Sequence, residues 1–174
     1  MSIQLSIMAS VLIVQLLTMM LFIFAWIFLI LSIASPSWVV KYYRGNQNSS
    51  EGLMIRCSDT GCYRYRAASK PHLIAHWLVY IMLAIMVVNT LPNISGICVN
   101  GCRNTVIYGF SYAMAAFSGF LVLLMYPTYI KDISSAGNIQ LSWGYFFFMI
   151  ADCMLIALSI ECFQVNTDLY PDIS

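Results

Sequence analysis

A long stretch without charge near the N-terminus constrains the fold of this chain more than any other feature. Residues 8–33 contain no Asp, Glu, Lys or Arg, and only Gln15, Thr18 and Ser32 interrupt the apolar run over 11–33. About 20 apolar residues cross a bilayer, where the backbone must satisfy its own hydrogen bonds as a helix. The run is longer than the apolar core of a secretory signal and no basic residue precedes it, so we predict an uncleaved membrane span.

The composition of the whole chain agrees with a membrane protein. Of its 174 residues, 61% are hydrophobic and 9% are charged, whereas roughly 25% of the residues in a soluble domain are charged. The formal net charge of +1 lacks the basic field that nucleic-acid binding requires, so nucleic acid is excluded as a main partner. A chain of this length holds a handful of spans and no soluble catalytic domain.

Three further apolar segments complete a predicted membrane α-helical fold, a four-helix transmembrane bundle. The spans cover 8–33, 73–92, 106–126 and 143–163. Loops over 34–72, 93–105 and 127–142 join them in a single domain, 1–174. Because the number of spans is even, both termini lie on the same side of the membrane.

The third span carries small residues at helical spacing, namely Gly109, Ala113, Ala116 and Gly119. Small residues let helix backbones approach closely within lipid. They indicate either a dimer face or close packing inside the chain's own bundle, and we favour the second interpretation.

The long loop over 34–72 has the composition of β-strands. Residues 38–44, 52–57 and 63–66 are rich in β-branched and aromatic side chains. Residues 138–143, in the loop 127–142, alternate apolar and polar side chains and are a candidate for one more strand. We therefore expect a small antiparallel β-sheet at one end of the bundle.

Two local motifs indicate that this sheet is extracellular. Cys57 and Cys62 flank Ser-Asp-Thr-Gly, a run of turn formers that brings two strand ends together, so a disulfide between them would close a hairpin. Disulfides are typical of oxidising compartments. Asn48 begins an Asn-Ser-Ser sequence, an N-glycosylation acceptor, in the same loop. We therefore predict an extracellular sheet, cytoplasmic termini and a cytoplasmic loop 93–105.

The distribution of basic residues opposes this sidedness. Loop 34–72 carries six Lys and Arg residues, loop 127–142 on the same side adds Lys131, and the opposite side has only Arg103. Basic residues usually gather in cytoplasmic loops, but the cysteine pair and the glycosylation motif outweigh that rule here. The long loop then presents six basic and two acidic residues outside, which is either a solvated face or a surface suited to an acidic partner or an anion.

Three cysteines lie near the predicted cytoplasmic boundary. Cys98 and Cys102 are in the short loop and Cys162 is at the end of the last span. Juxtamembrane cysteines are candidates for reversible palmitoylation, with plain free thiols as the alternative.

Asp152 is an acidic residue in the middle of the last span. Ionisable groups inside a membrane usually face the bundle interior or a partner, so Asp152 is a candidate functional residue. The alternative, which we favour, is a structural Asp that pairs inside the bundle with a group such as Asn89, Ser111 or Ser118.

The sequence shows no constellation for catalysis. Two cysteine pairs could suggest a quinone-linked thiol oxidase, but the predicted topology puts them on opposite sides of the membrane, which prevents direct exchange. His72 and His76 have a spacing that can bind zinc, but no acidic residue lies nearby, so we favour two interfacial polar residues. Phosphate-binding glycine loops and Ser/His/Asp groups are absent from the sequence. We predict no enzymatic activity and no cofactor.

The order of motifs in the long loop resembles the signature of the claudin superfamily. Between the first two spans the chain has, in this order, Trp38, Gly52-Leu53, Cys57 and Cys62. This order is similar to the Trp…Gly-Leu-Trp…Cys…Cys pattern of that group. Its members include the peripheral myelin, epithelial and lens fibre membrane proteins and the γ subunits of calcium channels and AMPA-type glutamate receptors. The resemblance implies a claudin-like four-helix bundle with a small extracellular antiparallel sheet.

The sequence also departs from that pattern. Met54 stands where the family has its second Trp, and the final residues Tyr-Pro-Asp-Ile-Ser differ from the Tyr-Val ending of many claudins. These departures argue against a standard tight-junction strand former. Residues 142–146 and 150–152 are loosely similar to the start of the fourth span in the receptor and calcium-channel branch, so the branch stays open.

The resemblance implies a plasma-membrane protein that acts in cell–cell contact, junctions or membrane organisation and binds itself or another four-span protein. Tyr63, Arg64, Tyr65 and Arg66 are the candidate contacts, because paired aromatics and arginines dominate interface energies. In a paracellular path, the basic loop would favour anions. The alternative is an auxiliary γ-type subunit of a channel or receptor, and a third option is a myelin-type membrane-organising protein.

Overall fold

The computed structural model describes residues 2–43, 46–58, 60–64, 70–98, 105–133 and 138–169. In this part of the chain there are four helices and five strands. The helices are α1 (Ser2–Ala34), α2 (Lys70–Cys98), α3 (Thr105–Ile133) and α4 (Trp143–Leu169). The strands are β1 (Val39–Tyr43), β2 (Asn46–Glu51), β3 (Ile55–Ser58), β4 (Gly61–Arg64) and β5 (Asn138–Leu141).

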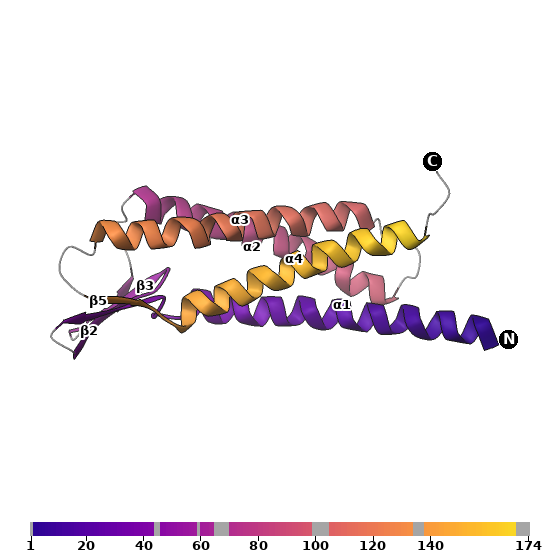
Figure 1. The fold of residues 1–174 in the computed structure, drawn as a ribbon, viewed down its shortest axis with the longest axis horizontal. Coiled ribbons are helices and arrows are strands. Elements are labelled where there is room, and N and C mark those ends of the chain that lie inside the picture. The colour runs from indigo at the N-terminus through magenta and orange to yellow at the C-terminus, as the bar shows by residue number, and fades with distance from the viewer. Residues whose placement is uncertain are drawn as a thin grey trace.

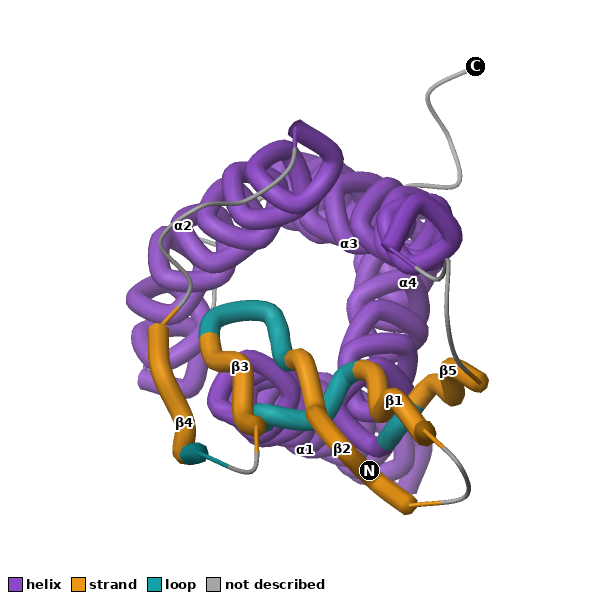
Figure 2. Tube along the Cα trace, turned by 90° about the vertical axis from the view of Figure 1, so that its left-hand side faces the viewer, coloured by secondary structure: helices purple, strands orange, loops and turns teal. Residues whose placement is uncertain are grey.

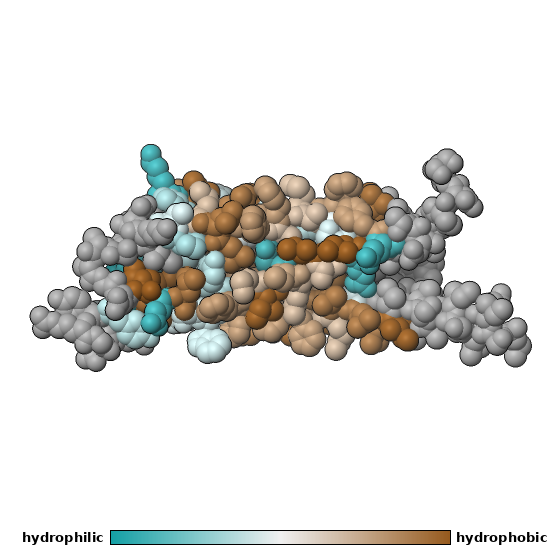
Figure 3. All heavy atoms as spheres, in the orientation of Figure 1, coloured by the Kyte–Doolittle hydropathy of each residue, from teal (hydrophilic) through white to brown (hydrophobic). Residues whose placement is uncertain are grey.

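All four helices are long and apolar enough to cross a membrane. The spanning windows are Leu16–Ala34, Lys70–Leu91, Val106–Thr128 and Trp143–Gln164. Hydrophobic residues cover most of the middle of the visible face, with hydrophilic residues toward its two ends (Figure 3). The prediction of a four-span, multi-pass membrane protein is therefore confirmed.

The helices form one bundle with the sheet at one end. Helix α4 lies between α1 and α3, and α3 also packs against α2. The start of α1 and the end of α4 lie together at the end of the bundle opposite the sheet (Figure 1). Viewed from the sheet end, the strands cross over the end of α1 and extend from α2 toward α4 (Figure 2). The first helix therefore starts, and the last helix ends, on the same side of the bundle, as an even number of spans requires.

The small residues of α3 pack inside this bundle. A Cβ atom added to Gly109 would lie 3.1 Å from the ring of Phe163, and one added to Gly119 would overlap the carboxylate of Asp152. Both neighbours belong to α4, so the small side chains let α3 and α4 approach closely. Packing within the chain's own bundle is what the structure shows at these two glycines.

All four helices are longer than the spans predicted from sequence. Helix α3 continues through Pro127 to Ile133 and α2 continues to Cys98, so helix extends past the predicted span ends at 126 and 92, although the apolar windows end close to them, at Thr128 and Leu91. Proline has no N–H for the carbonyl four residues earlier, which usually ends a helix. Here the Tyr145 hydroxyl of α4 donates to that carbonyl, on Leu123, and the helix continues.

The five strands form one antiparallel sheet in the order β4-β3-β2-β1-β5. Strands β1 and β4 overlap the predicted segments 38–44 and 63–66, and β5 pairs with β1 to join the same sheet. The segment 52–57 forms a strand only from Ile55 onward. Strand β2 is not predicted, because Asn-Gln-Asn-Ser-Ser-Glu has no apolar alternation, yet it occupies the centre of the sheet.

Candidate interaction surface of the sheet

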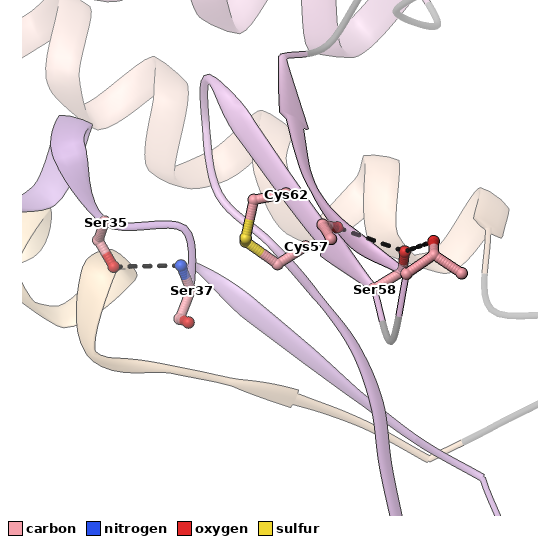
Figure 4. Close-up of a disulfide and its surroundings, with 7 residues drawn as sticks. Ser35, Ser37, Cys57, Ser58 and Cys62 are labelled. Carbon is pink, nitrogen blue, oxygen red and sulfur yellow. Dashed lines mark hydrogen bonds between the residues drawn. A yellow bond between two sulfur atoms is a disulfide. The ribbon is translucent and has the colours of Figure 1, made fainter.

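The hairpin of β3 and β4 is closed by a disulfide. Cys57 and Cys62 are cross-strand partners and their sulfur atoms are bonded at 2.02 Å, which confirms the predicted disulfide. The Ser58 hydroxyl lies 2.9 Å from that of Thr60 and also donates to the carbonyl of Gly61. Gly61 has a φ of +132°, a conformation that side-chain-bearing residues rarely adopt. Figure 4 shows the disulfide bridging the two strands beside the Ser58 contacts.

Strand β4 is an exposed edge of the sheet. All four of its residues are exposed, and the Tyr63 side chain keeps 51% of its surface accessible. Tyr63 pairs with Arg56 and Arg64 with Ile55 on β3, and β4 has no further strand on its outer side among the described residues. The outer backbone groups of an edge strand are open to pairing. Tyr65 and Arg66, the other two predicted contact residues, lie outside the described residues.

Charge on the sheet is organised around one buried acid. Glu51 of β2 is buried, and its Oε1 lies 2.8 Å from Lys41 Nζ and 3.2 Å from Arg56 Nε. These two cations of the long loop are therefore engaged within the sheet. Arg64 is exposed and forms no ion pair with any residue that the structure describes. Its side chain is the accessible positive charge on β4.

Trp38 joins the sheet to the helices. Its side chain is fully buried, its indole N–H donates to the carbonyl of Ser32 at 2.8 Å, and its ring centroid lies 4.8 Å from that of Tyr126 and 5.1 Å from that of Phe148. The Trp38 amide also donates to the carbonyl of Glu51. Trp38 is thus part of the frame that holds the strands, not of the accessible surface.

Gly52 and Leu53 lie in the same contact region between the sheet and the helices, which we call the joint of Trp38, Gly52 and Leu53. A Cβ atom at Gly52 would overlap the backbone of Ser35 and Pro36, which only glycine avoids. Leu53 is fully buried, and the His76 ring of α2 forms a hydrogen bond with its carbonyl. The Trp, Gly and Leu positions of the sequence motif therefore share one structural role, which is to seat the sheet on the bundle.

Met54 also contacts α2. It is half-buried against the core, and the Tyr80 hydroxyl points to its sulfur at 3.7 Å. A methionine at this position replaces the expected tryptophan with a flexible apolar contact to the helix.

The two histidines of α2 lie close together. The ring centroids of His72 and His76 are 4.3 Å apart, as expected for residues one helical turn apart. His76 bonds the Leu53 carbonyl. Among the described residues, no group of three or more His, Cys, Asp or Glu side chains could hold a metal ion.

Other predicted sites are placed only in part. Asn48 lies in strand β2 and Cys98 at the end of α2, but their side chains are outside the described residues, and so is the whole of Cys102. Cys162 is buried in the bundle core. In this conformation the Cys162 thiol is not accessible for palmitoylation.

Asp152 does not have the predicted hydrogen-bonding partners. Its side chain is 3% exposed and its Oδ1 has no hydrogen-bond partner. Asn89 and Ser111 instead bond one another at 2.8 Å, and Ser118 donates to the carbonyl of Met114. The expected pairing of Asp152 with one of these groups is therefore wrong.

A second acid in α4, Glu161, makes a contact that was not predicted from the sequence. Glu161 Oε1 accepts a hydrogen bond of 2.7 Å from the Thr18 hydroxyl, which links α4 to α1. The rule on intramembrane ionisable groups that singled out Asp152 applies here too. Glu161 was not predicted as a candidate because it lies close to the predicted end of the span, at residue 163.

Comparison with family models and with curated proteins identifies no relative of this chain. No protein-family model matches the chain, and no curated protein matches it. What the sheet does is therefore inferred from its own geometry and chemistry.

Proposed function

We propose that this chain is a non-enzymatic membrane protein that acts in cell–cell contact, junctions or membrane organisation, and that strand β4 is its contact surface. The partner is a second copy or a related four-span protein. The observation that supports this most directly is the exposed edge strand with Tyr63 and Arg64, held rigid by the Cys57–Cys62 disulfide.

The chemistry of β4 suits protein binding. Its outer edge offers backbone N–H and C=O groups to an added strand. Tyr63 and Arg64 supply the two residue types that contribute most to interface energies. Since the disulfide and the Ser58 contacts already order the hairpin, the hairpin loses little conformational entropy when a partner binds.

The proposed location is the plasma membrane, with the sheet outside and both termini in the cytoplasm. A disulfide in the sheet supports an oxidising compartment on that side. The start of α1 and the end of α4 lie at the opposite end of the bundle. Glycosylation at Asn48 and acylation at Cys98 or Cys102 belong to the same proposal.

The joint of Trp38, Gly52 and Leu53 supports a place in the claudin superfamily. All three residues are buried where the sheet meets the bundle, and the disulfide stands on the next hairpin. A shared frame of this kind explains why a sequence signature joins residues so far apart along the loop.

Extraction of the native protein in a mild detergent, followed by size separation and mass spectrometry, tests the proposal. We expect the chain to travel with copies of itself or with other four-span proteins. A defined complex with a channel or receptor would overturn the contact role in favour of an auxiliary subunit.

Charge reversal on β4 tests the contact surface. Arg64→Glu should lower self-association about thirtyfold, the effect of losing about 2 kcal/mol at an interface centre. Lys70→Glu makes the same charge change at an exposed residue at the start of α2 and serves as the matched control. Equal behaviour of both variants and the wild type would exclude β4 as the contact.

A further inference from the structure

A pocket lies where β1, β5 and the first turn of α4 meet. It has a volume of about 280 Å³. Its lining includes Tyr42 of β1, Gln140 of β5, Ser142 between β5 and α4, and Trp143 and Phe146 at the start of α4. None of these residues belongs to the proposed contact strand β4, so the pocket is independent of the proposed function.

The position of this pocket is at the membrane boundary. The spanning window of α4 begins at Trp143, so Gln140 and Ser142 lie on the sheet side of that boundary and Phe146 on the membrane side. Trp143 is 74% exposed, and amphipathic tryptophan rings favour the interfacial region. A molecule in the pocket would have one end among polar groups and the other among hydrocarbon chains.

The described residues that line the pocket are uncharged. Their polar side-chain groups are the amide of Gln140, the hydroxyls of Tyr42 and Ser142 and the indole N–H of Trp143. The cation next to Tyr42 along β1 is Lys41, and its ammonium is engaged by Glu51 at 2.8 Å. A lipid phosphate would call for a charged donor, whereas a neutral hydroxyl group matches these side chains.

An apolar surface continues from the pocket along α4. Phe146, Met149 and Cys153 are exposed and follow one another by three and four residues, so they lie on one helix face. This face begins at the pocket and runs into the membrane-spanning part of α4. A rigid apolar molecule could contact this face along its whole length.

We propose that the pocket binds a sterol from the sheet-side leaflet of the bilayer. The sterol hydroxyl lies among Gln140, Ser142 and Tyr42, and the flat ring system lies against Trp143 and Phe146. The neutral polar lining, the location at the membrane boundary and the apolar face of α4 together select this class of lipid.

Photolabelling of the full chain in phosphatidylcholine nanodiscs tests this site. A photoreactive cholesterol analogue is compared with a phosphatidylcholine that carries the same photoreactive group, and adducts are mapped by mass spectrometry. We expect cholesterol adducts concentrated within 138–153 and reduced by unlabelled cholesterol. Trp143→Ala should reduce them about fivefold, as expected for loss of one aromatic contact.

Trp77→Ala is the matched control, because Trp77 is 60% exposed in the spanning window of α2 and does not line the pocket. Gln140→Ala is the second variant and should also reduce labelling, since it removes the amide without touching the membrane face. Any one of four results would overturn the proposal. The adducts could spread evenly over all four spans, or the phosphatidylcholine probe could label the site as strongly as the cholesterol probe. Labelling could also be unchanged in Trp143→Ala, or fall equally in both tryptophan variants.

Discussion

The Tyr145 hydroxyl donates a hydrogen bond of 3.1 Å to the carbonyl oxygen of Leu123. Pro127 lies four residues after Leu123 in α3 and has no N–H to offer that carbonyl. Unpaired backbone groups are costly within a membrane-spanning segment, and side chains of neighbouring helices can satisfy them. The contact therefore explains how α3 accommodates a proline, and it ties α3 to the first turn of α4.

Tyr145→Phe should lower the free energy of unfolding by about 1–3 kcal/mol, because it leaves the Leu123 carbonyl without a donor while keeping the ring. Thermal unfolding followed by circular dichroism in detergent measures the change. Tyr108→Phe on α3 is the control, since the Tyr108 hydroxyl has no hydrogen bond among the described residues. Equal melting temperatures for the Tyr145 variant and the wild type would contradict the role of this contact.

Gly119→Ala should destabilise the bundle by about 1–3 kcal/mol, as overpacking of a core does. The new Cβ would overlap the Asp152 carboxylate. Asp152→Ala in the same chain should relieve most of this loss, and a double-mutant cycle of unfolding free energies measures the coupling.

Gly109→Ala on the same helix is the control for that cycle. Its Cβ would meet the ring of Phe163 instead of Asp152, so Asp152→Ala should not rescue it. Additive behaviour of Gly119→Ala and Asp152→Ala would show that the two residues do not compete for space.

Glu51→Gln should lower the stability of the sheet by about 1–3 kcal/mol, because Lys41 and Arg56 lose a buried counter-charge. Hydrogen exchange of the backbone amides of β1, β2 and β3 should speed up while the helices stay protected. Arg64→Gln changes an exposed side chain that has no ion pair in the described chain and should leave exchange unchanged. Similar exchange in both variants would remove Glu51 from the frame of the sheet.

The sidedness of the sheet predicts which thiols are reached from outside. On intact cells, an impermeant maleimide should label Cys57 and Cys62 only after an impermeant reductant opens their disulfide. Cys98 should react only after the membrane is permeabilised. Asn48→Gln should also remove a glycan-dependent mobility shift. Labelling of Cys98 on intact cells, together with an unglycosylated Asn48, would show the inverted topology.

Opening the disulfide should loosen the hairpin without disturbing the bundle. The Cys57→Ser/Cys62→Ser double variant is expected to lose about 2 kcal/mol, the chain-entropy effect of a short closed loop. Proteolysis within the β3–β4 hairpin should speed up while the helices remain intact. Unchanged protease resistance would show that the Ser58 contacts alone hold the turn.

The four spans and the hairpin disulfide could be predicted from the sequence because each depends on local chemistry. A long run without charge such as 8–33 has no alternative to a helix in lipid, and turn formers between Cys57 and Cys62 act over a few residues. The prediction of strand β5 also succeeded, because its alternating pattern is local.

Tertiary contacts decided the features that local patterns could not show. Strand β2 is polar and becomes a strand because β1 and β3 flank it on both sides. Helix α3 passes Pro127 because Tyr145, on another helix, satisfies the carbonyl of Leu123. Asp152 lies against Gly119, while its expected partners bond elsewhere. Each outcome depends on residues far apart in the chain, whose meeting is set by packing in three dimensions.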